Sequence, residues 1–317
     1  LARGGAISFS LGNKGYIGEG CDGGWTTYND FWEWDQATDS WTQKANPPAI
    51  GRDSPVGFSI GNFGYMGTGD SMTFQNQNNV ALSDFWQYNP YTNTWTQMVD
   101  FGGGDRRYAV SFTIGCKGYV GMGDHGGWWT AVHHDDFWEF TPPNPSAAIA
   151  GINTICSGDS TSLFATGGLF YQWSTGETTN IIDVTPTVTT TYSVIVSDGC
   201  GSSTAGMTVT VIPTPVAGFT SVLDPCASCS DFTNSSLNGV SWLWDFGDSA
   251  TSTSQHNNHC YPDTGTYSVS LIAYSTQGMC RDTFASSVNF FNTDETQLIV
   301  PNVFSPNNDN TNDSYKL

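Results

Sequence analysis

The chain has 317 residues, which is enough for two or three domains with cores of their own. Its 29 acidic residues against 9 Lys and Arg give a formal net charge of -20, which argues against binding to nucleic acids or anionic membranes because both need basic patches. No apolar run is long enough to span a bilayer, and Gly, Ser, Thr and Asn are abundant, so we expect a soluble, mostly β protein without membrane insertion.

One sequence pattern occurs three times in the first half of the chain. Each copy is a glycine-rich segment around a Gly-Tyr pair, followed by an Asp-Phe-Trp run. The glycine-rich segments cover residues 12–20, 61–69 and 115–123, and the Asp-Phe-Trp runs begin at Asp30, Asp84 and Asp136. The repeat length of about 50 residues is that of one blade of a β-propeller.

The composition of the repeats favours stacked sheets. In Phe31-Trp32-Glu33-Trp34, large side chains occupy both faces of the strand, which is typical of strands that are covered on both sides. With these features, residues 1–142 resemble the Kelch family of β-propellers. The family's spacing of an aromatic residue and a later Trp is kept from Tyr88 to Trp95 and, with Trp in place of Tyr, from Trp34 to Trp41.

Two departures from the Kelch pattern carry consequences. The adjacent glycines of the family become Gly-X-Gly, and the third copy has Phe140 but no Trp at position 147, so we expect its sheet to lack the outer strand. Propellers close with about four to eight blades, and three cannot form a ring because each blade needs two neighbours. Arg3 aligns with Arg52 and Arg106, which places residue 1 in mid-repeat. We expect further blades before residue 1, with completion of the ring by another molecule as the alternative.

The loops between the glycine strand and the Asp-Phe-Trp strand are the candidate ligand-binding segments. They cover residues 21–29, 70–83 and 124–135, differ in length, and carry aromatic residues beside Asp and Asn. Exposed rings in such loops suit stacking on sugar faces or contact with a surface protein. The candidate binding residues are Trp25, Tyr28, Trp128 and Trp129. The alternative is that these rings pack onto neighbouring blades.

A Pro-rich connector at residues 141–145 ends the repeats. Residues 147–213 then alternate with period two between turns, which predicts a small antiparallel sandwich. On residues 154–159 and 171–176 this segment resembles immunoglobulin-like modules of secreted proteins from gliding bacteria. That resemblance places Trp173 in the core.

A second sandwich is expected over residues 216–292, after the Ile-Pro-Thr-Pro joint that ends at Pro215. The runs Trp244-Asp245-Phe246-Gly247-Asp248 and His259-Cys260-Tyr261, followed by residues 265–269, resemble the PKD domain. Ser249 stands where the family usually has Gly, which leaves the turn plausible.

The last segment, residues 298–317, resembles the start of the gliding-motility-associated C-terminal sorting domain, on the residues 300–313. Asn308 and Asn310 stand where that family has Gly. The resemblance implies a protein of Bacteroidota that is exported by the type IX secretion machinery. Its location would then be extracellular, at the cell surface.

The eight cysteines lack the paired spacing of a zinc ribbon and indicate disulfides in an oxidising compartment. We expect Cys156 to pair with Cys200, because that bond would tie an early and a late strand of one sandwich. Cys226, Cys229, Cys260 and Cys280 allow three connectivities. Cys21 and Cys116 fall at non-equivalent places in their repeats, so we expect them to be free buried thiols.

The sequence offers four candidate groups of metal ligands. His133-His134-Asp135-Asp136 and the group His256, His259 and Cys260 offer transition-metal ligands, but adjacent strand residues point to opposite faces and His259 belongs to the PKD resemblance. Calcium is the better candidate, in a loop with alternating oxygen-bearing side chains whose alternative is a solvated turn. Its candidate ligands are Asn307, Asp309, Thr311 and Asp313. Asp245 and Asp248 are weaker candidates, with backbone caps as the alternative.

No serine-nucleophile elbow, HExxH motif or phosphate loop occurs in the sequence. The sequence therefore predicts an all-β, non-enzymatic surface protein in which a partial Kelch-like propeller precedes two sandwiches. Its expected work is adhesion or attachment through a glycan or protein ligand, with no cofactor other than calcium. One alternative is a structural subunit of an extracellular filament or secretion assembly, and another is an accessory region of a secreted polysaccharide-degrading enzyme.

Overall fold

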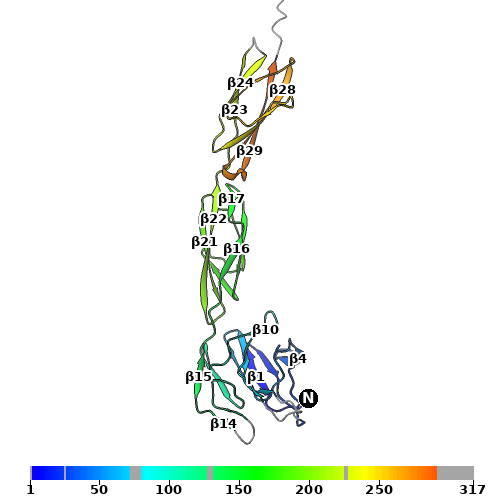
Figure 1. The fold of residues 1–317 in the computed structure, drawn as a ribbon, viewed down its shortest axis with the longest axis vertical. Coiled ribbons are helices and arrows are strands. Elements are labelled where there is room, and N and C mark those ends of the chain that lie inside the picture. The colour runs from blue at the N-terminus through cyan, green and yellow to red at the C-terminus, as the bar shows by residue number, and fades with distance from the viewer. Residues whose placement is uncertain (1, 25, 72–79, 127–130, 225–227, 291–317) are drawn as a thin grey trace, which may run out of the picture. The chain divides into compact units, whose positions relative to one another are not determined.

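The computed structural model describes residues 2–24, 26–71, 80–126, 131–224 and 228–290 (Figure 1). The chain is all-β over these residues, as the sequence predicted, and one short 3-10 turn, η1 (Thr276–Gly278), accompanies the strands. Within the described ranges, no helix is long and apolar enough to cross a bilayer.

The three sequence repeats form three antiparallel sheets, which we call the first, second and third repeat sheets (Figure 1). The first contains β1 (Ile7–Leu11), β2 (Lys14–Gly18), β3 (Phe31–Asp35) and β4 (Ser40–Gln43). The second contains β5 (Val56–Ile60), β6 (Phe63–Gly67), β9 (Phe85–Asn89) and β10 (Thr94–Gln97). The third contains β11 (Val110–Ile114), β12 (Lys117–Gly121) and β15 (Phe137–Phe140), and among the described residues it has no fourth strand, as expected.

Short two-stranded ribbons occupy the loops of the second and third repeats. They are formed by β7 (Asp70–Ser71) with β8 (Val80–Ala81) and by β13 (Asp124–His125) with β14 (Val132–His133).

The repeat sheets pack against one another through aromatic residues. Between the first and second sheets, Phe31 lies against Tyr88 with ring centroids 4.9 Å apart. Between the second and third, Tyr65 lies against Phe140 at 5.2 Å. Since side chains of both strand faces are covered in this way, the second sheet has large apolar residues at odd and even positions alike, which explains the composition of its strands.

Two more sheets follow the repeats. One contains β16 (Ala148–Gly151), β18 (Thr161–Thr166) and β20 (Ile181–Val184), and the other contains β17 (Thr154–Cys156), β22 (Ser202–Ile212), β21 (Thr190–Ser197) and β19 (Phe170–Trp173). Trp173 is 2% exposed, so its predicted place in the core is confirmed. The chain divides into two compact units, and the residues of these sheets belong partly to one and partly to the other. The first unit comprises Leu1–Gly151, Ser162–Ile182 and Tyr192–Met207, and the second comprises Ile152–Thr161, Asp183–Thr191 and Thr208–Leu317.

The last described segment forms two further sheets (Figure 1). One contains β23 (Phe219–Asp224), β24 (Cys229–Asn234) and β27 (Asn257–Cys260), and the other contains β26 (Thr251–Ser252), β25 (Ser241–Asp245), β28 (Gly265–Tyr274) and β29 (Arg281–Phe290). Phe219 and Phe232 from the first of these sheets and Trp244 and Leu271 from the second share one buried core. This is the arrangement of a two-layer sandwich.

The disulfides differ from the expected pairing. The bonds join Cys116 to Cys200, Cys156 to Cys280, and Cys229 to Cys260. The predicted bond between Cys156 and Cys200 is wrong, because Cys156 lies beside Ile212 at the end of β22 while Cys200 precedes the start of that strand. An extended strand of this length separates its two ends by several times the reach of a disulfide.

The thiol state of the repeat cysteines was predicted correctly at one position and wrongly at the other. Cys21 is free and buried, as expected. Cys116 is not free, because the hairpin between β11 and β12 brings it next to Cys200. Cys226 lies outside the described residues.

Candidate functional site

Of the aromatic candidates in the repeat loops, only Tyr28 lies within the described residues, and Trp25, Trp128 and Trp129 lie outside them. The Tyr28 hydroxyl donates a hydrogen bond to Asp22 Oδ2 at 3.1 Å. The Arg3 guanidinium lies 4.7 Å from the Tyr28 ring centroid and covers one ring face. The loop therefore holds Tyr28 against the protein's own side chains on that face.

The calcium candidates Asn307, Asp309, Thr311 and Asp313 also lie outside the described residues. Across the residues that are described, no three His, Cys, Asp or Glu side chains are arranged to hold a metal ion. His134 Nε2 lies 2.8 Å from His125 Nδ1, and Cys260 is consumed by its disulfide.

In the second sandwich, the acidic turn residues make structural contacts. Asp245 accepts a hydrogen bond from the Gly247 backbone N–H, and Asp248 accepts one from the Ala250 backbone N–H. This is the capping role that the sequence analysis gave as the alternative to calcium binding. The other oxygen of Asp248 lies 2.7 Å from His259 Nε2, and the His259 ring stacks on Phe246 with centroids 4.1 Å apart.

A groove of about 440 Å³ opens between the first and second repeat sheets, at the end that carries the β1–β2 hairpin. Sequence reasoning missed it. Its walls are formed by Leu11, Gly12, Asn13, Lys14, Tyr16, Glu33, Lys44, Gly61, Asn62, Pro90 and Tyr91. Grooves of this volume are within the range of small-molecule sites.

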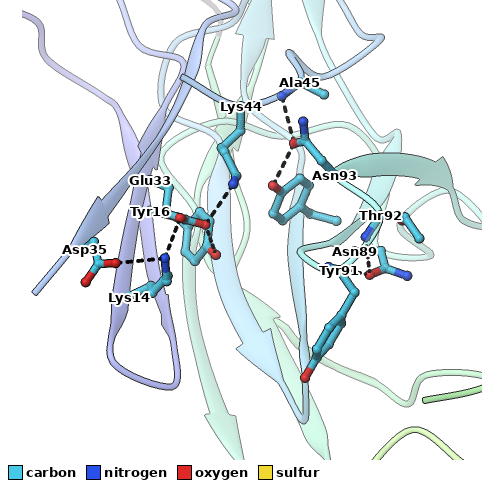
Figure 2. Close-up of polar contacts among 11 residues, drawn as sticks. Lys14, Tyr16, Glu33, Asp35, Lys44, Ala45, Asn89, Tyr91, Thr92 and Asn93 are labelled. Atoms are coloured by element: carbon cyan, nitrogen blue, oxygen red, sulfur yellow. Dashed lines mark hydrogen bonds and ion pairs between the residues drawn. The ribbon is translucent and has the colours of Figure 1, made fainter. Parts of the chain in front are cut away.

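Glu33 is the centre of the polar contacts on one wall, as Figure 2 shows. Its carboxylate accepts a hydrogen bond from the Tyr16 hydroxyl at 2.6 Å, and the ammonium groups of Lys14 and Lys44 lie at 2.8 and 3.2 Å. Burial by itself would raise the pKa of Glu33, but the hydrogen bonds from these three donors together hold that pKa below its usual value. Glu33 is therefore ionised and saturated with donors.

Lys14 also contacts Asp35, at 3.1 Å from the carboxylate. Hydrogen bonding to Glu33 and then to Asp35 raises the pKa of Lys14. The wall thus carries two ammonium groups and two carboxylates, whose charges cancel. The antiparallel register explains the cluster, since Tyr16 lies opposite Glu33 and Lys14 lies opposite Asp35 on the paired strands β2 and β3.

The other wall is the turn between β9 and β10. Asn89 Oδ1 accepts a hydrogen bond from the Tyr91 backbone N–H at 2.9 Å, and Asn93 Oδ1 accepts from the Tyr88 hydroxyl at 2.9 Å and from the Ala45 N–H at 3.0 Å (Figure 2). These bonds fix the turn, and the Tyr91 side chain remains 65% exposed. An aromatic ring on a rigid turn can stack on a ligand at little entropic cost.

The groove lining offers an exposed aromatic ring and several hydrogen-bonding groups. The one buried carboxylate in its lining, Glu33, already accepts from three donors. An exposed ring, two amide side chains and a neutral cluster of charges are suited to hold a polar, uncharged ligand.

A second repeated feature explains the Asp-Phe-Trp runs. In each repeat an arginine pairs with the Asp of its own run, and the Asp also accepts from the indole N–H of the Trp two residues later. The pairs are Arg3 with Asp30, Arg52 with Asp84 and Arg106 with Asp136, and the indoles are those of Trp32, Trp86 and Trp138. The alignment of the three arginines was visible in the sequence, but their partners were not assigned from it. Arg52 and Arg106 are almost fully buried, which gives these pairs a structural role.

The comparisons with known proteins concern mainly the last part of the chain. The family model for the PKD domain matches residues 210–289. No curated protein sequence matches the chain.

Among solved structures, the PKD1 domain of the Vibrio cholerae metalloprotease PrtV is 32% identical over 24% of this chain and 96% of its own length, with a TM-score of 0.23. The PKD1 domain of Vibrio anguillarum Epp is 28% identical over 24% of this chain and 93% of its own, with a TM-score of 0.23. The protein YjhT aligns over 91% of this chain and 98% of its own at 16% identity, with a TM-score of 0.38.

The PKD match agrees with the two-layer sandwich, with the Trp-Asp-Phe-Gly-Asp run in and after β25, and with the core that contains Trp244 and Phe246. Residues 210–289 of this chain form a PKD domain.

Proposed function

We propose that this protein is a secreted, non-enzymatic binding protein that acts in attachment at the cell surface. The three repeat sheets are blades of a Kelch-like propeller, and they present the ligand site. The segment 147–213 is an immunoglobulin-like module that follows the blades, and the PKD domain follows it. Support comes from the matching strand order and register of the three sheets, from the PKD domain, and from three disulfides, which are typical of extracellular proteins.

The groove between the first and second repeat sheets carries the proposal. Its ion pairs cancel one another, and the Tyr91 ring is exposed at its edge. The net charge of -20 on the whole chain disfavours polyanionic ligands. The ligand class that fits is a neutral oligosaccharide, which stacks an apolar sugar face on Tyr91 and hydrogen-bonds to Lys14 and the neighbouring amides.

Binding of the 317-residue chain to an array of neutral and acidic oligosaccharides tests this assignment. Neutral glycans are expected to bind, and Tyr91→Ala is expected to weaken them at least about tenfold, which corresponds to about 1.4 kcal/mol. Tyr28→Ala is the matched control, because Tyr28 lies in a repeat loop and outside the groove. Loss of binding in Tyr28→Ala together with full binding in Tyr91→Ala would contradict the groove as the ligand site. It would indicate that the ligand binds at the repeat loop that contains Tyr28.

Export is proposed to follow the type IX route of Bacteroidota, with the type IX machinery as partner. The support is the resemblance of residues 300–313 to the start of a gliding-motility-associated sorting domain. Protease treatment of intact cells of the source organism is expected to degrade the protein, and deletion of a type IX component is expected to protect it inside the cell. Equal degradation in both strains would contradict this route.

A further inference from the structure

Each repeat sheet carries a surface of three aromatic rings, which we call its ring face. The ring faces consist of Phe9, Tyr16 and Phe31 in the first sheet, Phe58, Tyr65 and Phe85 in the second, and Phe112, Tyr119 and Phe137 in the third. The first two rings of each set stack with centroids 5.4, 5.6 and 5.2 Å apart in the three sheets. The third sheet therefore builds the same surface as the other two.

The three ring faces differ sharply in burial. Phe31 and Phe85 are 0% and 1% exposed because the next repeat sheet covers them. On the third sheet, Phe112 is 44% and Phe137 is 48% exposed, and Ile114 beside them is 65% exposed. Nothing within the described parts of the chain covers this face. An apolar surface of this kind marks a site of protein contact.

The sheet that covers a ring face contributes a glycine at the point of closest approach. A Cβ added at Gly64 would lie 2.3 Å from the Phe9 ring, and one added at Gly118 would lie 2.4 Å from the Phe58 ring, so no side chain fits at either position. Gly15 occupies the same position in the first sheet, where an added Cβ would meet only Trp34, at 3.5 Å or more. The glycine that would accept a further ring face is therefore present, and no ring face among the described residues covers it.

The first sheet also offers the aromatic residues that cover a ring face. In the second sheet, Tyr88 and Trp95 pack on Phe31 with centroids 4.9 and 5.0 Å away. Their counterparts in the first sheet are Trp34 and Trp41, which lie opposite each other on β3 and β4. Trp41 is 55% exposed, so among the described residues this face of the first sheet is open as well.

We propose that two copies of this chain associate head to tail, with the ring face of the third repeat sheet in one copy docked on the Gly15 face of the first repeat sheet in the other. Phe112 then lies over Gly15, and Phe137 lies against Trp34 and Trp41. The contact continues two interfaces that already exist within the chain, between the first and second sheets and between the second and third. A backbone hydrogen bond would be repeated too. Gly20 N–H donates to Arg52 O, and Gly69 N–H donates to Arg106 O. The next pair in this series is Gly123 N–H of one copy with Arg3 O of the other.

The number of sheets agrees with a closed assembly. Two copies of the repeats that the structure describes supply six repeat sheets, and radial arrangements of this kind close with about four to eight. A head-to-tail contact forms a ring rather than a filament when the rotation between successive sheets closes. This inference concerns self-association through the sheet faces and goes beyond the ligand groove, so either can fail without the other.

Sedimentation velocity of the 317-residue chain over a range of micromolar concentrations tests the proposal. Wild-type protein is expected to form a species of twice the monomer mass, and Phe112→Asp and Gly15→Ala are each expected to weaken association at least about 30-fold, as for a central contact residue. Neither change should unfold the monomer, because Phe112 is exposed there and a methyl group at Gly15 makes only an ordinary contact. Gly23→Ala, where an added Cβ meets nothing within 4 Å, is the control and should associate normally.

Mixing the two variants separates this contact from other modes of pairing. Phe112→Asp retains an intact Gly15 face and Gly15→Ala retains an intact ring face, so the mixture is expected to regain one contact and form a heterodimer. A wild-type chain that stays monomeric at all concentrations would overturn the proposal, whether the ring face is then bare or covered by other residues of its own chain. An association that Gly15→Ala leaves unchanged would overturn it as well, since two ring faces would then be meeting each other.

Discussion

Arg52 holds Asp84 through two parallel hydrogen bonds, from Nη1 to Oδ1 at 2.6 Å and from Nη2 to Oδ2 at 2.8 Å. Arg52 Nη1 also donates to the Thr68 carbonyl oxygen at 3.0 Å, and Trp86 donates its indole N–H to Asp84. The arginine is 1% exposed, so the pair ties the start of the second repeat to the beginning of β9 inside the protein. The same arrangement recurs in all three repeats.

Replacing Arg52 is expected to destabilise the second repeat sheet. Arg52→Ala leaves the Asp84 carboxylate and the Thr68 carbonyl without their cation, and breaking a buried pair in this way costs about 3–5 kcal/mol. Arg52→Lys should cost less, because an ammonium group keeps the charge and loses only the paired geometry. Native-state hydrogen exchange of β6 and β9 measures the loss, and exposed Arg281→Ala is the control that should leave both strands unchanged.

Glu19 is expected to give the repeat region a pH-dependent stability. Its side chain is 0% exposed, Oε2 accepts the Arg52 backbone N–H at 2.9 Å, and Oε1 has no partner among the described residues. Burial, opposed by the nearby Arg52 charge, raises the pKa of Glu19 from 4.5 to about 8. Between these values the folded chain holds a proton that the unfolded chain releases, so stability falls as pH rises from about 5 to 8.

Glu19→Gln is expected to remove this dependence. Between pH 5 and pH 8 the free energy of unfolding of the wild-type protein should fall by a few kcal/mol relative to that of Glu19→Gln. Hydrogen-exchange protection of β2 and β6 at the two pH values measures this difference. Glu177 is exposed, so Glu177→Gln should show the same pH dependence of stability as the wild type. Protection that changes equally with pH in Glu19→Gln and wild type would show that Glu19 does not hold the proton.

The disulfide arrangement predicts the products of a peptide map. Digestion of the unreduced protein is expected to release linked peptides that contain Cys116 with Cys200 and Cys156 with Cys280. Cys21 should react with a thiol reagent only after unfolding, because it is buried and burial raises its pKa to about 11. A linked peptide joining Cys156 to Cys200 would contradict the structure.

Much of the fold was predictable because it depends on local patterns. The three repeats, the absent fourth strand after Phe140, the core position of Trp173 and the PKD domain follow from residue spacing and from short motifs. The disulfide partners were not predictable, since Cys156 and Cys280 come together only through the placement of strands far apart in the sequence. The sequence prediction paired Cys156 with Cys200 instead, because both lie within one predicted sandwich.

The groove was missed for a related reason. Its residues come from two repeats, whereas the sequence prediction placed the ligand site in the aromatic loops that differ between the copies. A signal was present in the strands, because Lys14, Tyr16 and Glu33 fall at alternate positions that an antiparallel pair brings to one face. The third repeat has the same set at Lys117, Tyr119 and Glu139, whereas the second has Phe63, Tyr65 and Gln87. Comparison of the copies would therefore have shown that the charged cluster recurs in two of the three repeats.

Saturation-transfer NMR of a neutral oligosaccharide with the full chain, followed for a day, tests the central claim of a non-enzymatic binding groove most directly. The account predicts transfer from the protein to the protons of a sugar ring, loss of that transfer in Tyr91→Ala, and a glycan spectrum that stays unchanged throughout. Absence of transfer for every neutral glycan tried, or new signals from a cleaved or oxidised product, would contradict it.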